Sequence, residues 1–69
     1  MEPAEKYVRL RLGDRVVVQG MPFEARICEI FPKDRSGRVR IKLDWGIHGY
    51  SHVWLHDEGR IWQRYIELN

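Results

Sequence analysis

The sequence predicts an all-β domain, and three features of the chain support this prediction. Apolar residues do not repeat with helical spacing over any long segment. Several short stretches rich in Val, Ile and aromatic residues alternate apolar with polar side chains, as strands with one buried face do. Gly, Pro and Asp separate these stretches at short intervals, which is typical of turns. The chain is therefore predicted to be a series of short strands.

The size and composition of the chain indicate one small folded module. It has 69 residues, of which 43% are hydrophobic and 12% aromatic, too apolar for a disordered segment and too interrupted by charge for a membrane span. We expect residues 1–6 to be a flexible lead and residues 7–69 to form a single domain. The start of the chain lacks the apolar run of a secretory signal, and the single Cys28 cannot form an internal disulfide. Both features predict a reducing, intracellular compartment.

The first half of the chain contains three predicted strand segments. Residues 7–12 alternate, and we expect a short edge strand or a cover for one end of the core there. Residues 15–19 are a β-branched strand that ends at Gly20. Residues 23–31 form the next strand, in which the apolar register shifts after Ile27. This shift predicts a β-bulge or a strong bend near Ile27 to Glu29.

The second half of the chain is organised around a predicted strand pair. After a polar turn at residues 32–37, residues 38–44 alternate apolar and charged side chains and form the clearest strand. Residues 50–56 also alternate, but both of their faces carry large side chains. A tight turn is expected at residues 57–59, and residues 60–68 are predicted to contain a last strand or a short helical turn.

Four or five short strands in a chain of this length favour a small bent barrel of the SH3-like type, because closure removes exposed strand edges. A barrel of the oligonucleotide-binding type is less compatible with this sequence because its strands are longer. We expect Trp54 and Trp62 to fill the barrel together with smaller apolar residues. The predicted aliphatic core consists of Val16, Val18, Ile27, Val39, Ile41, Leu43, Val53 and Leu55.

Two surface features suggest binding. In the loop of residues 44–50, Gly46 and Gly49 allow tight backbone turns that present Trp45 and Tyr50. The net charge is only +2, but Arg38, Arg40 and Lys42 recur at alternate positions along one strand. This basic row is either the solvated face of a half-buried strand or a surface for phosphates or acidic peptides. With Tyr50, Trp54 or Trp45 nearby, it is also compatible with single-stranded nucleic-acid binding.

Four segments occur in the order of the strands of a known domain group. They are GDRV at residues 13–16, FEARI at residues 23–27, RVRIKLDW at residues 38–45 and YSHVW at residues 50–54. In this order the chain resembles the Tudor, chromo-barrel and malignant-brain-tumour group of SH3-like domains. The resemblance implies a five-stranded SH3-like barrel that reads methylated lysine or arginine on chromatin in the nucleus.

The resemblance also implies a binding site. A methylated ammonium group favours a box of aromatic faces, whose quadrupoles attract the cation. Residue by residue, Phe23, Trp45 and Tyr50 match the walls of this cage, and Asp44 is the carboxylate candidate. Methylated histone peptides are then the implied partners of a monomeric module within a larger protein. The alternatives are an unmodified protein partner, as for SH3-like barrels in ubiquitin ligases and scaffolds, and nucleic acid on Arg38, Arg40 and Lys42.

The sequence gives little support for an enzyme, a metal site or a cofactor. His48, His52 and His56 recur every four residues, but only His52 and His56 lie on the predicted strand of residues 50–56, where they share a face ~13 Å apart. Cys28 lies within an apolar strand segment, where an inert core thiol is expected rather than a nucleophile. No glycine-rich phosphate loop leads from a strand into a helix. We therefore expect a binding module without catalytic activity.

Overall fold

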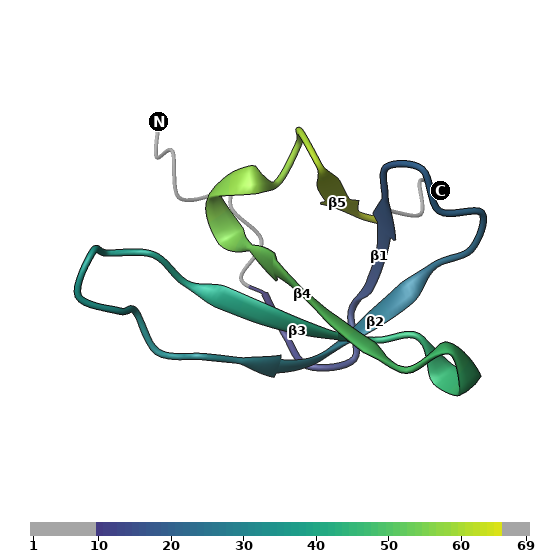
Figure 1. Cartoon of the computed structure of the whole chain (residues 1–69), viewed down its shortest axis with the longest axis horizontal. Helices are drawn as coiled ribbons and strands as arrows, with labels where there is room; N and C mark the ends of the chain where they lie inside the picture. Colours follow the sequence, from purple (N-terminus) through teal and green to yellow (C-terminus); the bar gives the residue numbers. More distant parts are fainter. Residues whose placement is uncertain (1–9, 66–69) are drawn as a thin grey trace, which may run out of the picture.

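Five antiparallel strands form the domain in the computed structural model, which describes residues 10–65 (Figure 1). The strands are β1 (Arg15–Val18), β2 (Ala25–Ile30), β3 (Arg40–Asp44), β4 (Tyr50–Trp54) and β5 (Trp62–Arg64). Short 3-10 turns, η2 (Gly46–His48) and η3 (Leu55–Asp57), follow β3 and β4. The strand order is β4-β3-β2-β1-β5, so β1 to β4 meander and β5 returns to pair with β1. This is the small SH3-like bent barrel that the sequence predicts.

The predicted bulge in β2 is confirmed. Ile27 pairs with Leu43 and Ile30 pairs with Ile41, but the register shifts between Ile27 and Glu29. The extra residue allows isoleucines three positions apart to face the same side of the sheet, which regular alternation would not permit. Glu29 consequently lies opposite Lys42 on the outer side.

The core lies on the inner side of the bent sheet. Its buried residues are Val16, Ala25, Ile27, Ile41, Leu43, Val53 and Trp62. Five of the eight predicted aliphatic core residues are buried, while Val18, Val39 and Leu55 are half-buried and pack against the core. Trp62 also fixes the end of the barrel, because its indole N–H donates a 2.8 Å hydrogen bond to the backbone carbonyl of Trp54.

The placement of Trp54 in the core was wrong. Trp54 is the last residue of β4, next to the buried Val53, so strand alternation places its side chain on the outer side of the sheet. The ring is half-buried there, with the Arg38 guanidinium over it and the His56 ring stacked against it, and it does not fill the core.

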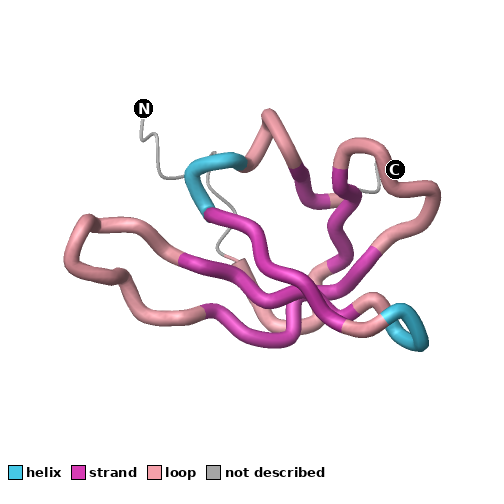
Figure 2. Tube along the Cα trace, viewed as in Figure 1, coloured by secondary structure: helices cyan, strands magenta, loops and turns pink. Residues whose placement is uncertain are grey.

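β3 begins at Arg40, two residues later than the sequence predicts, because the preceding residues fold into a loop (Figure 2). Asp34 Oδ1 accepts hydrogen bonds from the Ser36 hydroxyl (2.7 Å), the Ser36 backbone N–H (2.9 Å) and the Arg38 backbone N–H (2.9 Å). These bonds favour the ionised carboxylate and hold the pKa of Asp34 below its ordinary value of 3.8, with the bond from the Ser36 hydroxyl contributing most. The loop therefore has a carboxylate at its centre.

The ends of the described chain differ from the predicted strands. Residues 10–12 do not form a strand; Leu10 packs against the core as a cover, whereas Leu12 is 64% exposed. The predicted lead at residues 1–6, residues 7–9 and residues 66–69 lie outside the described residues. Within residues 10–65 there is no helix with the length and apolar character needed to cross a membrane.

Candidate functional site

The outer side of β3 and β4 carries a row of charged and aromatic side chains. Arg40 pairs with Trp54, Lys42 with His52, and Asp44 with Tyr50. Directly paired residues point to the same side of a sheet. Because the intervening residues of both strands are directed to the core or half-buried, these six side chains all face away from it.

Each cation of the row lies over an aromatic ring. The guanidinium carbon of Arg38 is 4.7 Å from the ring centroid of Trp54, and that of Arg40 is 4.5 Å from the centroid of Phe31. Lys42 Nζ is 4.5 Å from the centroid of Tyr50. These distances are within the range of cation–π interactions. We call this surface the basic aromatic face: Phe31, Arg38, Arg40, Lys42, Tyr50, His52 and Trp54.

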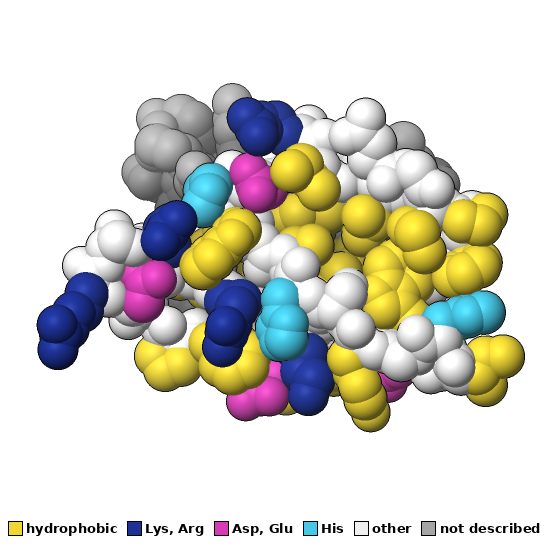
Figure 3. Space-filling view, viewed as in Figure 1, with side chains coloured by type: hydrophobic (Ala, Val, Ile, Leu, Met, Phe, Trp, Pro, Cys, Tyr) yellow, Lys and Arg dark blue, Asp and Glu magenta, His cyan; other side chains and the backbone are white. Residues whose placement is uncertain are grey.

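The backbone explains why these side chains converge. The Phe31 N–H donates to the Arg40 carbonyl at 2.9 Å, which extends the pairing of β2 with β3 by one residue and places the ring beside that strand. Phe31 also lies against His52, with ring centroids 5.9 Å apart. The long cation stems cover the rings, yet Tyr50 remains 63% exposed and His52 is exposed. Figure 3 shows Lys, Arg and His side chains interspersed with hydrophobic ones over this part of the surface.

Two carboxylates lie at one end of the face. Glu29 is opposite Lys42, and Asp44 is opposite both Tyr50 and Arg26. Asp44 Oδ1 accepts a 2.8 Å hydrogen bond from the Gly46 backbone N–H, so this carboxylate fixes the start of the β3–β4 loop. At the other end, Asp34 lies near Arg38 and accepts a hydrogen bond from its backbone N–H, so both ends of the face have a carboxylate nearby.

Two of the predicted cage residues contact each other on the other side of the sheet. The Phe23 and Trp45 rings have centroids 5.9 Å apart and planes at 75°. Trp45 Nε1 donates a 2.7 Å hydrogen bond to Ser51 Oγ, and its half-buried ring packs against the core. His48 stacks on Phe23 with a centroid distance of 4.7 Å and planes at 15°. Phe23, Trp45 and His48 therefore form one aromatic cluster.

The other two predicted cage residues lie elsewhere. Tyr50 and Asp44 form a directly paired position on the outer side of the sheet, where Tyr50 contacts Lys42. Trp45, in contrast, is hydrogen-bonded to Ser51, whose side chain points the opposite way from that of Tyr50. The structure thus brings Phe23 and Trp45 together and places Tyr50 with the basic row of Arg38, Arg40 and Lys42.

Sequence reasoning missed three residues of these surfaces. His48 reaches Phe23 because η2 places it one 3-10 turn after Trp45, and residues three apart eclipse in such a turn. Phe31 and His52 join the basic aromatic face through strand pairing, which the sequence does not specify. The sequence feature that could have indicated them is the presence of large side chains on both faces of residues 50–56, which suggests that the outer face of this strand also makes contacts.

The described residues offer no group of three His, Cys, Asp or Glu side chains placed to hold a metal ion. Cys28 is half-buried in the bulge of β2, and its thiol donates to the Lys42 carbonyl at an Sγ to oxygen distance of 3.6 Å. Comparisons of the chain with protein-family models, with curated proteins and with solved structures find no match.

Proposed function

We propose that this chain is a non-catalytic binding module whose basic aromatic face binds single-stranded nucleic acid. The observation that carries the proposal is the ladder of three cations, each resting on an aromatic ring, along one exposed side of β3 and β4. Single-strand binders combine cations that track the phosphate backbone with aromatic rings that stack on the bases. Both groups are present here on one side of the sheet, on β3 and β4 and at the loop that joins β2 to β3.

The spacing of the ladder suits an extended strand. Alternate residues of a β-strand lie ~6.8 Å apart, which is the spacing of Arg40 and Lys42 on β3, and Arg38 in the loop before β3 continues the row beside Trp54. On the neighbouring strand, Trp54 is opposite Arg40 and His52 is opposite Lys42, while Tyr50 is opposite Asp44. A single strand lying along β3 would therefore meet cations and rings at the same intervals.

On binding, the aromatic rings are expected to exchange their cation–π contacts for stacked bases. A cation–π contact at an exposed site contributes about 0.5–1 kcal/mol, whereas a base stacked on an aromatic ring contributes about 1–3 kcal/mol. When a base stacks on Tyr50, Lys42 is released from the ring to a phosphate, so the lost contact is replaced by a stronger one and a charge pair. The cation–π contacts of the free protein hold both partners near their binding positions.

The charge distribution predicts where contact is strongest. Glu29 and Asp44 lie at the Tyr50 end, and their charges oppose phosphates there. Arg40 is paired with Trp54 and not with a carboxylate, whereas Asp34 lies near Arg38, so phosphates are expected to bind most tightly at Arg40, beside Trp54 and Phe31.

The salt dependence of binding tests the proposal. The affinity for a fluorescent twelve-nucleotide oligo(U) and oligo(dT) is measured by anisotropy between 50 and 200 mM salt. Each phosphate contact contributes about 0.7 to the slope of log affinity against log salt for single strands. Changing Arg38, Arg40 and Lys42 together to Ser removes three cations and should reduce the magnitude of this slope by about two.

The matched control changes Arg11, Lys33 and Arg60 to Ser. This variant loses the same charge from exposed positions that are not part of the basic aromatic face, so its slope should stay close to that of the parent. Equal slopes for the two triple variants would show that only net charge matters, and parent binding that ignores salt would refute the proposal.

A second candidate function, recognition of a methylated Lys or Arg side chain, is supported by the near-perpendicular rings of Phe23 and Trp45. Phe23 is 40% exposed, so its ring is open to solvent beside Trp45. Because His48 stacks on one face of Phe23, a cation would bind at the free face or displace the imidazole. Titration with trimethylated and unmodified lysine peptides tests this candidate: Trp45→Ala should abolish methyl-dependent binding, and equal affinity of the parent for both peptides would exclude it.

A further inference from the structure

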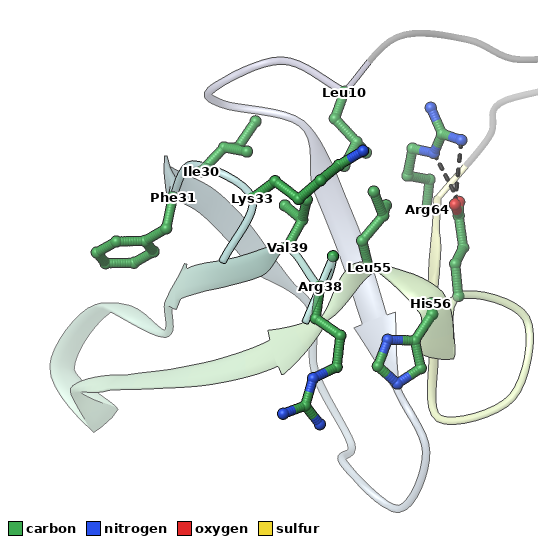
Figure 4. A pocket seen from close by; sticks show the side chains of 11 residues that line it. Leu10, Ile30, Phe31, Lys33, Arg38, Val39, Leu55, His56 and Arg64 are labelled. Carbon is green, nitrogen blue, oxygen red and sulfur yellow. Dashed lines mark hydrogen bonds and ion pairs between the residues drawn. The ribbon is translucent and has the colours of Figure 1, made fainter. Parts of the chain in front are cut away.

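A groove with an apolar floor lies beside the basic aromatic face. It has a volume of about 890 Å³ and opens between the start of the described chain, the β2–β3 loop, η3 and β5. Figure 4 shows Leu10, Ile30, Val39 and Leu55 gathered around the same opening. All four are half-buried and pack against the core, so the floor is fixed by the fold.

The floor selects the chemistry of an occupant. Its four side chains are aliphatic, and none of them offers an aromatic face for a stacked base or a polar atom for a hydrogen bond. Burial of apolar surface in such a groove stabilises a complex. The groove is therefore suited to an aliphatic or aromatic side chain rather than to a nucleobase.

The rim selects the charge of the occupant. Lys33, Arg38, His56 and Arg64 line the groove together with one carboxylate, Glu58. Glu58 is already paired, because Arg64 Nε and one of its terminal nitrogens donate to its two oxygens at 2.7 and 3.3 Å. The excess charge at the rim is thus positive and comes from Lys33 and Arg38, of which Lys33 is not part of the basic aromatic face.

From this floor and rim we infer that the groove docks a peptide segment in which apolar side chains are flanked by carboxylates. The apolar side chain lies on Leu10, Val39 and Leu55, and the flanking carboxylates lie near Lys33, which extends towards Leu10 in Figure 4. This site is separate from the proposed nucleic-acid function, although Phe31 and Arg38 border both surfaces. The groove is an interaction surface for an acidic, amphipathic partner.

The test uses the full chain, labelled at its methyl groups, and a capped peptide of two leucines flanked on each side by two glutamates. The methyl signals of Ile30, Val39 and Leu55 should shift and saturate. A peptide with serines in place of the leucines should not bind, because nothing enters the floor. A peptide with lysines in place of the glutamates should bind about fivefold more weakly, because the loss of an exposed charge pair weakens binding by up to about this factor.

A pair of charge reversals locates the contact. Lys33→Glu should weaken binding of the acidic peptide about fivefold, whereas Arg60→Glu, the same charge change at a side chain that is 74% exposed and not part of the groove, should leave it unchanged. Equal effects of the two reversals, or equal binding of the serine or lysine peptide, would overturn the inference.

Other occupants would give different outcomes. Methyl shifts caused by the oligonucleotide and not by the peptide would assign the groove to nucleic acid. Shifts that depend only on protein concentration would assign it to a second copy of the chain. No shift of these methyl signals with the acidic peptide would also overturn the inference, independently of whether the oligonucleotide binds to the basic aromatic face.

Discussion

Replacing Trp62 with Phe should lower the free energy of unfolding of the barrel more than the same change at Trp54 does. Trp62 is 2% exposed, and its indole N–H donates to the Trp54 carbonyl at 2.8 Å, which connects β5 with the end of β4. Trp54 is half-buried on the outer side of the sheet. The two variants therefore compare the loss of a core indole with the loss of an outer-side indole, using the same chemical change.

The expected magnitude at Trp62 has two parts. Loss of the indole N–H leaves the Trp54 carbonyl without its donor, at a cost of about 1–3 kcal/mol. The smaller ring leaves part of the core unfilled, which costs roughly 1–2 kcal/mol more. A domain of 69 residues has a free energy of unfolding of about 3–10 kcal/mol. Trp62→Phe thus removes a large share of the stability.

Urea unfolding followed by far-UV circular dichroism measures both variants. We expect the free energy of unfolding to fall by about 2–5 kcal/mol for Trp62→Phe and by less than about 1 kcal/mol for Trp54→Phe. A Trp62→Phe protein within 1 kcal/mol of the parent, or a Trp54→Phe protein that loses as much, would refute the assignment of the two rings to opposite sides of the sheet.

Two further outcomes are expected. Ile41→Ala should cost about 2–5 kcal/mol in the same urea assay, because Ile41 is fully buried in β3; a scarcely destabilised variant would contradict the strand register. A carbon-detected pH titration should place the pKa of Asp34 below 3.8, so its contribution to stability is present above pH 3.8 and is lost as the pH falls through the folded pKa. An Asp34 side chain with a pKa at or above 3.8 would contradict the hydrogen bonds of this loop. So would an Asp34→Asn protein whose stability falls at acid pH in the same way as that of the parent.

The barrel could be predicted because its local patterns agree with one another. Val39, Ile41 and Leu43 alternate with charges, so the buried side of β3 is clear from the sequence alone. The apolar pattern shifts by one position after Ile27, and one extra residue in the strand accounts for this shift. The β2–β3 pairing contains that extra residue between Ile27 and Glu29. Short strands between glycine-marked turns then leave few ways to close a small sheet.

The candidate site was less predictable because it depends on pairing across strands. The core position predicted for Trp54 rests on the tendency of small barrels to fill their centre with aromatic rings, and only the pairing of Trp54 with Arg40 shows that its ring faces outward. Trp45 and Tyr50 are neighbours in a short loop, but the intervening η2 turn starts β4 with Tyr50 directed outward while Trp45 packs inward. Side-chain direction at a loop of this kind follows from its backbone path, which composition does not reveal.

Nucleic-acid binding through the basic aromatic face is tested most directly by a matched pair of tyrosine variants. Lys42 lies 4.5 Å from the ring centroid of Tyr50, and Arg15 lies 4.6 Å from that of Tyr65 at the other end of the strand order. Anisotropy titration of oligo(U) should give an affinity at least about fivefold lower for Tyr50→Ala, since a stacked base is lost, and an unchanged affinity for Tyr65→Ala. Equal affinities of the parent and Tyr50→Ala, or an equal loss in both variants, would contradict the proposed function.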